Sequence, residues 1–64
     1  MSQTTVVLEH IKTYGSITPL EALTRYGIMR LAARIFDLEA EGYNIKTTIK
    51  KHDGRRYASY SMEA

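Results

Sequence analysis

The dipeptide Asp53-Gly54 constrains the fold most, because it lies between two segments whose side chains alternate in character. In YNIKTTIKK and in RRYASYSM, bulky or apolar residues alternate with polar ones, which is typical of strands with one buried face. Asp-Gly between such segments is a strong signal for a two-residue hairpin with a type I′ turn. The C-terminal third of the chain is therefore predicted to form a β-hairpin.

The two-residue turn also fixes which residues of the hairpin face each other. Ile49 is then opposite Ala58 on a largely apolar face, and Lys50 is opposite Tyr57 on a polar face. Because an isolated hairpin is marginal in water, the apolar face is expected to pack on the rest of the chain, with Ile17 as a candidate third strand. The remaining pairs are Thr47–Tyr60 and Ile45–Met62 on the apolar face, and Thr48–Ser59 and Lys46–Ser61 on the polar face.

The segment TTVVLEHIKTYG is predicted to form a first helix. Val7, Ile11 and Tyr14 recur at i, i+4 and i+7, a spacing that places them on one apolar stripe. His10 lies off this stripe, among polar residues. Gly15 follows as the residue that ends the helix, because a left-handed conformation costs glycine little.

The segment TPLE carries the clearest helix start in the chain. Thr18 suits the N-cap, Pro19 suits the first helical position, and Glu21 is placed to complete a capping box with Thr18. A helix is predicted from residue 19 to residue 26, and so short a helix is stable only when it packs on its neighbours. Its buried side is expected to contain Leu20, Leu23 and Ala22.

A third helix is predicted after a turn closed by Gly27. It is expected to begin near Ile28 or Met29 and to end near Glu41, before Gly42. Its buried stripe, at i, i+4 and i+7, consists of Leu31, Ile35 and Leu38, with Ala32 and Phe36 beside it.

Arg30 and Arg34 are expected one turn apart on the polar face of this helix, in its N-terminal half. One interpretation is a solvated face with local ion pairs to Asp37, each worth roughly a few tenths of a kcal/mol. The other is a recognition helix, because the second helix of a helix-turn-helix enters the DNA major groove, where arginine commonly reads guanine. Ala32 and Ala33 keep the helix thin near its start, which allows close approach to a nucleic acid or to another helix.

Positive charge is concentrated towards the C-terminus of a chain whose formal net charge is only +2. Residues 1–41 contain four basic and five acidic residues, whereas residues 42–62 contain five basic residues and one acidic residue. The hairpin tip, KKHDGRR, places Lys51 opposite Arg56 and His52 opposite Arg55, and facing like charges are destabilising. A phosphate backbone would relieve this repulsion. The alternative is a solvated loop that discourages edge aggregation.

The composition offers little for catalysis. The 64 residues include no cysteine, and the two histidines, His10 and His52, belong to no metal-ligand spacing. No glycine-rich phosphate loop or nucleophile elbow is present, so we expect no enzymatic activity, cofactor or metal. Since the N-terminus lacks a signal-peptide pattern and no apolar run could span a membrane, we expect a soluble, cytoplasmic, single domain over residues 1–64 with no membrane partner.

A capped short helix, a glycine turn, an arginine-bearing helix and a basic hairpin, in that order, predict an α+β fold of the winged helix-turn-helix type. The sequence also resembles a small winged helix-turn-helix family of bacteriophages and prophages, through ITPLEAL, YGI, RLAARI and LEAEGYNI, over about residues 7–60. The resemblance implies a three-helix core, a β-wing and DNA binding in a bacterial cell. It places Arg30 and Arg34 on the recognition helix and Lys50 to Arg56 on the wing. The interval from Ala22 to Gly27 is one residue longer than in the tightest helix-turn-helix patterns.

The predicted function is sequence-specific binding of double-stranded DNA, by a transcription regulator or a recombination accessory factor. The alternative is a protein-interaction module for a host or phage protein, which the near-neutral charge favours; self-association on DNA is also open. Tyr57 is expected either near the DNA backbone or as an exposed strand residue that covers Lys50. Tyr26 and Tyr43 are expected to be core or packing residues. The predicted DNA contacts are Met29, Arg30, Ala33 and Arg34 in the major groove, and Lys50, Lys51, Arg55 and Arg56 at phosphates or an adjacent minor groove.

Overall fold

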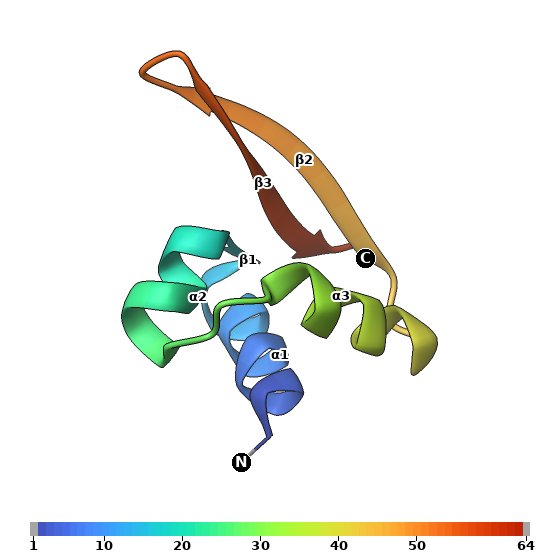
Figure 1. The fold of residues 1–64 in the computed structure, drawn as a ribbon. Coiled ribbons are helices and arrows are strands. Elements are labelled where there is room, and N and C mark those ends of the chain that lie inside the picture. Colours follow the sequence, from blue (N-terminus) through green and yellow to red (C-terminus); the bar gives the residue numbers. More distant parts are fainter. Residues whose placement is uncertain (1, 64) are drawn as a thin grey trace.

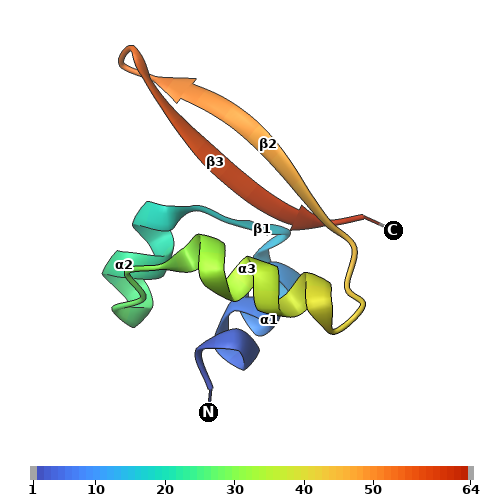
Figure 2. The same ribbon diagram turned by 45° about the vertical axis from the view of Figure 1, so that its right-hand side comes forward.

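A computed structural model describes residues 2–63, which form three helices and a three-stranded antiparallel sheet (Figure 1). Figures 1 and 2 show the helices gathered at the open end of a long hairpin, whose turn projects away from them. In chain order the elements are α1 (Gln3–Tyr14), β1 (Ser16–Ile17), α2 (Pro19–Tyr26), α3 (Leu31–Ala40), β2 (Ile45–His52) and β3 (Arg55–Met62).

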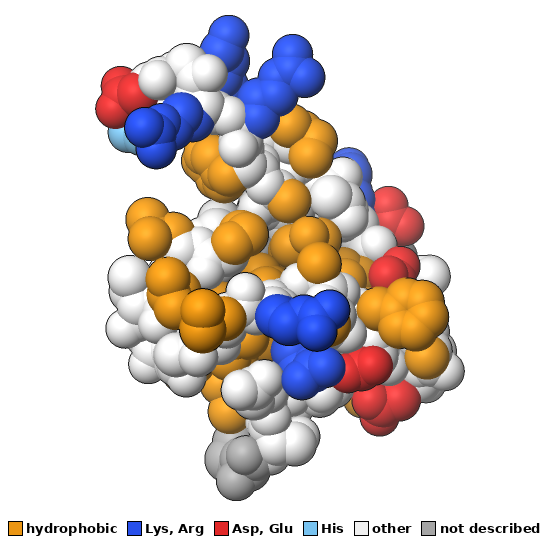
Figure 3. Space-filling view, viewed as in Figure 1, with side chains coloured by type: hydrophobic (Ala, Val, Ile, Leu, Met, Phe, Trp, Pro, Cys, Tyr) orange, Lys and Arg blue, Asp and Glu red, His pale blue; other side chains and the backbone are white. Residues whose placement is uncertain are grey.

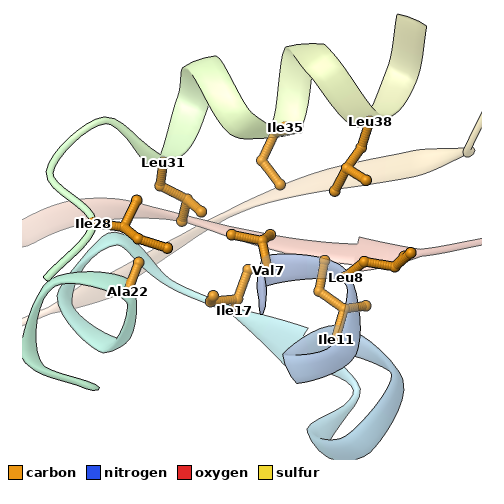
Figure 4. Close-up of a cluster of buried hydrophobic side chains, with 9 residues drawn as sticks. All are labelled: Val7, Leu8, Ile11, Ile17, Ala22, Ile28, Leu31, Ile35 and Leu38. Atoms are coloured by element: carbon orange, nitrogen blue, oxygen red, sulfur yellow. The ribbon is translucent and has the colours of Figure 1, made fainter. Parts of the chain in front are cut away.

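The core lies between the three helices and the base of the sheet (Figure 4). Figure 4 shows Leu31, Ile35 and Leu38 pointing from α3 toward α1, as their spacing predicts. Ile17 of β1 is fully buried, and its strand pairs with β3, which confirms the third strand. The buried apolar residues are Val7, Leu8, Ile11, Ile17, Ala22, Ile28, Leu31, Ile35 and Leu38.

The C-terminal half of α1 differs from the prediction. Tyr14, expected on the buried stripe, is 60% exposed, whereas His10, expected off it, is only 2% exposed. The reason is α2, because Tyr26 covers this side of α1 and its hydroxyl lies 2.7 Å from Nδ1 of His10. The ring of Tyr14 packs against that of His10 at a tilt of 43° with centroids 4.6 Å apart, and the Arg25 guanidinium lies 5.1 Å above the Tyr14 ring.

The start of α2 is the predicted capping box. The backbone N–H of Glu21 donates to Thr18 Oγ1 at 3.2 Å, and the backbone N–H of Thr18 donates to Glu21 Oε1 at 3.0 Å. The predicted buried side is correct only for Ala22, because Leu20 and Leu23 are 69% and 48% exposed. The small Ala22 side chain lets this short helix approach the core closely, while the two leucines, at i and i+3, share a face directed away from it.

Ile28 supplies the apolar bulk that the leucines were expected to supply. Gly27 ends α2 with φ +68°, and the N–H of Ile28 then donates to the carbonyl of Ala22 at 3.0 Å. This turn folds Ile28 back into the core, where it is 2% exposed. A Cβ at position 27 would force an L residue into the left-handed region, which glycine tolerates best.

The third helix begins later than predicted, at Leu31. Because Ile28 is held in the core, residues 28–30 form the connection, and Arg30 becomes the N-cap with φ −121° and ψ 64°. The predicted C-terminal end is confirmed. Gly42 has φ +102°, its N–H donates to the Glu39 carbonyl, and the N–H of Tyr43 donates to the Leu38 carbonyl at 3.1 Å. These two bonds make a Schellman motif.

The hairpin has the predicted register over its whole length, from Ile45 opposite Met62 to His52 opposite Arg55. Both turn residues have positive φ, +50° at Asp53 and +76° at Gly54, as a type I′ turn requires. Turn chemistry and side-chain alternation therefore fix the pairing together.

Only the base of the hairpin packs on the helices. Ile45, Tyr60 and Met62 contact the core, but Ile49, on the same face near the turn, is 62% exposed. The expectation that the whole apolar face is covered is wrong, because the helices and β1 reach only the base while the two strands extend beyond them (Figures 1 and 2). The distal part of the hairpin, residues 49–58, is called the wing below.

Candidate nucleic-acid interface

The connection between α2 and α3 presents α3 at the surface. Figure 2 shows α3 running across the helical layer, with the wing projecting beyond it. The buried stripe of α3 packs mainly on α1, and the residues of α3 that are exposed to a partner are Ala32, Phe36, Glu39 and Ala40. Met29, which precedes the helix, is 85% exposed.

Arg30 lies at the start of α3 and is exposed. Its side chain makes no capping hydrogen bond, and no carboxylate of residues 2–63 pairs with it. The peptide N–H groups of the first turn add partial positive charge to this end of the helix. Arg30 is thus an unpaired cation at the end of α3 that carries positive potential.

Arg34 is in a different situation. Its Nε lies 3.1 Å from Oδ2 of Asp37, an ion pair whose geometry makes no hydrogen bond. Its Nη1 donates to Oε1 of Gln3 in α1 at 3.3 Å, and its side chain is only 32% exposed. The local ion pair considered from the sequence is therefore confirmed, and Arg34 points along the flank of α3 that faces the start of α1. Ala33, beside it, is half-buried.

The wing tip, residues 50–56, concentrates the basic side chains seen at the end of the hairpin in Figure 3. Lys51 faces Arg56 and His52 faces Arg55, as predicted. The one carboxylate of the tip, that of Asp53, lies 3.3 Å from Nε2 of His52 rather than beside a lysine or arginine. The predicted phosphate-binding residues Lys50, Lys51, Arg55 and Arg56 are all exposed.

A hollow of about 530 Å³ separates the wing tip from the start of α2 (left side of Figure 3). It is lined by Thr18, Leu20, His52, Arg55, Arg56 and Tyr57. The structure thus brings Arg55, Arg56 and Tyr57 together with α2, whereas no residue of α3 lines this hollow. Tyr57 is 37% exposed and pairs with Lys50 across the hairpin. The predicted contacts therefore form two separate groups, one at the start of α3 and one at the wing tip.

Sequence reasoning missed the exposed apolar residues. Phe36, expected beside the buried stripe, is 70% exposed, and Leu20, expected in the core, lies at the hollow. The spacing of Phe36 from Ala32 and Ala40, at i−4 and i+4, was the available signal for a second apolar stripe on α3.

Within residues 2–63, no three His, Asp or Glu side chains gather where they could hold a metal ion. None of the helices described is long and apolar enough to cross a membrane.

Three helices, the last two joined by a short turn, followed by an antiparallel hairpin, define a winged helix-turn-helix domain, a class that binds DNA. The expected α+β fold class is therefore confirmed. The chain belongs to the family described as "Winged helix-turn-helix domain", whose model matches residues 2–64. Comparison with curated proteins and with solved structures gave no significant match.

Proposed function

We propose that this chain is a sequence-specific DNA-binding protein of phage or prophage type, acting in the bacterial cytoplasm on transcription or as an accessory factor in recombination. Membership of the winged helix-turn-helix family supports DNA binding in general. The observation that carries the proposal is the wing tip, where cations face one another and have no carboxylate partner among residues 2–63. Such an arrangement is stabilised by a polyanion, because phosphates offset the repulsion and counterions are released.

The start of α3 enters the major groove in this proposal. Arg30 is free to donate two hydrogen bonds to a guanine edge, and Met29 and Ala33 lie beside it without a charge to desolvate. Arg34 approaches the edge of the groove while it keeps its ion pair with Asp37 and its hydrogen bond to Gln3, so it contributes less to binding than Arg30 does. The acidic residues of α3 lie in its C-terminal half, away from this contact.

The wing supplies phosphate contacts in the same complex. Lys50, Lys51, Arg55 and Arg56 contact the backbone beside the groove, and Tyr57, at the rim of the hollow, adds a hydrogen bond or stacking near the backbone. These contacts are independent of sequence and provide affinity, whereas α3 provides discrimination.

The test is the salt dependence of binding to a duplex. Affinity is expected to fall steeply with ionic strength, and Arg55→Ala or Arg56→Ala should each lower the slope of log K against log salt by about one. Lys12→Ala is the matched control, because it removes one exposed positive charge from α1 and should leave the slope unchanged. Binding that is insensitive to salt, or a slope that falls equally in all three variants, would contradict the proposal.

A second candidate is a module that binds a host or phage protein, or a second copy of the chain. The exposed apolar side chains Leu20, Leu23, Met29 and Phe36 favour it, because large exposed apolar patches often mark protein interfaces. Analytical ultracentrifugation of the free chain, and of the chain with duplex, separates the two candidates. A DNA-independent oligomer that is dispersed by Leu23→Ala would support the second.

A further inference from the structure

The exposed surface of α3 is divided into two chemically distinct flanks. At about 100° of rotation per residue, Ala32, Phe36 and Ala40 form one outer stripe, on one side of the buried stripe. Arg34 and Asp37 lie on the other side and pair with each other. The outer stripe therefore carries methyl groups and a phenyl ring, with the exposed carboxylate of Glu39 beside Phe36 at i+3. On the other flank, Arg34 and Asp37 offset each other's charge.

The outer stripe begins in the N-terminal half of α3, which the proposed function places in the major groove, and its side chains are exposed. Phe36 is 70% exposed and Met29, which precedes the helix, is 85% exposed. Ala32 is exposed as well, so three apolar side chains are available in or before the first two turns of α3. Figure 3 shows hydrophobic side chains over α3 on the same face as basic and acidic ones. Of the two arginines near the start of α3, Arg30 is the one with no carboxylate partner among residues 2–63.

We infer that α3 recognises DNA mainly through the 5-methyl groups of thymine, an inference that rests on the proposed DNA binding. Thymine is the base that displays a methyl group in the major groove, and alanine and phenylalanine side chains are suited to contact it. Met29, Ala32 and Phe36 make these contacts, and Arg30 reads a guanine at the end of the thymine-containing segment. The preferred site is therefore a short run rich in A·T pairs, flanked by a G·C pair.

The charges around the outer stripe favour DNA over an apolar protein surface as its occupant. Arg30 precedes α3 with no carboxylate partner among residues 2–63, and the four cations of the wing tip lie beyond it on the hairpin. A duplex offers both phosphates for these cations and methyl groups for the stripe. Glu39, at i+3 from Phe36, and the C-cap residue Glu41 are both exposed, and their charges restrict the approach of phosphates to the N-terminal half of α3.

The test begins with selection of bound duplexes from a random pool. The selected duplex is then resynthesised with deoxyuridine in place of each thymidine in turn, which removes the methyl group and keeps base pairing. Affinity is expected to fall about fourfold per contacted methyl group, from the ~0.8 kcal/mol that burial of one such group contributes. The salt slope should stay the same, because the phosphates are unchanged.

The variant Phe36→Ala, combined with the deoxyuridine replacements, tests whether Phe36 contacts a thymine methyl group. The side chain is 70% exposed, so the variant should fold, and its preference for thymidine over deoxyuridine should disappear at the position that Phe36 contacts. Leu23→Ala, which shortens an exposed apolar side chain of α2, is the control and should keep the preference. A preference that persists in Phe36→Ala would overturn the role of this residue.

Two further outcomes distinguish failure of this inference from failure of the proposed function. Salt-dependent binding with equal affinity for thymidine and deoxyuridine duplexes would overturn thymine recognition and leave DNA binding intact. Absence of duplex binding at low salt would overturn the proposed function itself. If Phe36→Ala disperses an oligomer and leaves the thymidine preference unchanged, the outer stripe is a protein interface and the inference is wrong.

Discussion

The start of α3 and the wing tip are both basic in sequence, but Arg34 of α3 has a carboxylate partner, whereas Arg30 and the lysines and arginines of the wing tip have none among residues 2–63. Arg34 is paired with Asp37 and anchored to Gln3, and α3 is fixed to the core through its buried stripe. At the wing tip, Lys51 and Arg56 face each other with no carboxylate partner among the described residues, and little of the hairpin there is buried. A helix fixed to the core through its buried stripe is suited to discrimination between DNA sequences, and the projecting basic tip is suited to affinity for a polyanion.

The largest expected effect concerns the stability of the two regions. Leu38→Ala, at a side chain that is 1% exposed, should lower the free energy of unfolding by about 2–5 kcal/mol, because it leaves a cavity in the core. Ile49→Ala, at a residue on the wing that is 62% exposed, should change it by about 0.5 kcal/mol or less. Urea unfolding followed by circular dichroism measures both. Similar losses in the two variants would show that the wing packs on the core in solution.

The next effect concerns the two arginines of α3. Arg30→Ala should weaken binding to the selected duplex by about 1–3 kcal/mol, because it removes a base contact, and should relax specificity at one position. Arg34→Ala should weaken binding less than Arg30→Ala, because its guanidinium is held by Asp37 and Gln3 and makes no base contact. Titrations with the selected duplex and with a scrambled duplex measure both. Equal losses would mean that Arg34 leaves its partners on DNA.

The smallest effect separates stability from binding at the wing tip. Arg56→Ala removes a like charge opposite Lys51 and should raise the free energy of unfolding by a few tenths of a kcal/mol at low salt, while it weakens DNA binding. Lys46→Ala is the matched control, because Lys46 faces Ser61 on the same hairpin and should give no such gain. Thermal melts at low and high salt measure the difference, which salt should abolish. A loss of stability in Arg56→Ala would show that the facing cations do not repel each other.

Local signals predicted a large part of this fold. The turn residues Asp53 and Gly54 and the alternation of side chains determine the register together, and the capping box at Thr18 determines where α2 begins. These features depend on residues close in sequence, so the sequence alone carries them.

The predictions were wrong where contacts between residues far apart in the sequence determine which side chains are buried. Which face of α2 is buried depends on Ile28, which fills the space that Leu20 and Leu23 were expected to occupy. His10 is buried because α2 places Tyr26 over it, a contact between residues 16 positions apart. For the candidate site, residue types indicated the two basic groups, but the pairing of Arg34 with Gln3 and the exposure of Phe36 required the packed helices.

The central claim, that the start of α3 and the wing tip contact DNA together, is tested most directly by titrating the isotopically labelled chain with the selected duplex and following backbone amide chemical shifts by NMR. The account predicts chemical-shift changes concentrated at residues 29–36 and 50–57, with α1 little changed. As salt is raised, the changes at the wing should diminish before those at α3. If duplex DNA at low salt moves neither Arg30, Arg34 nor the wing tip, the chain does not bind DNA in this way.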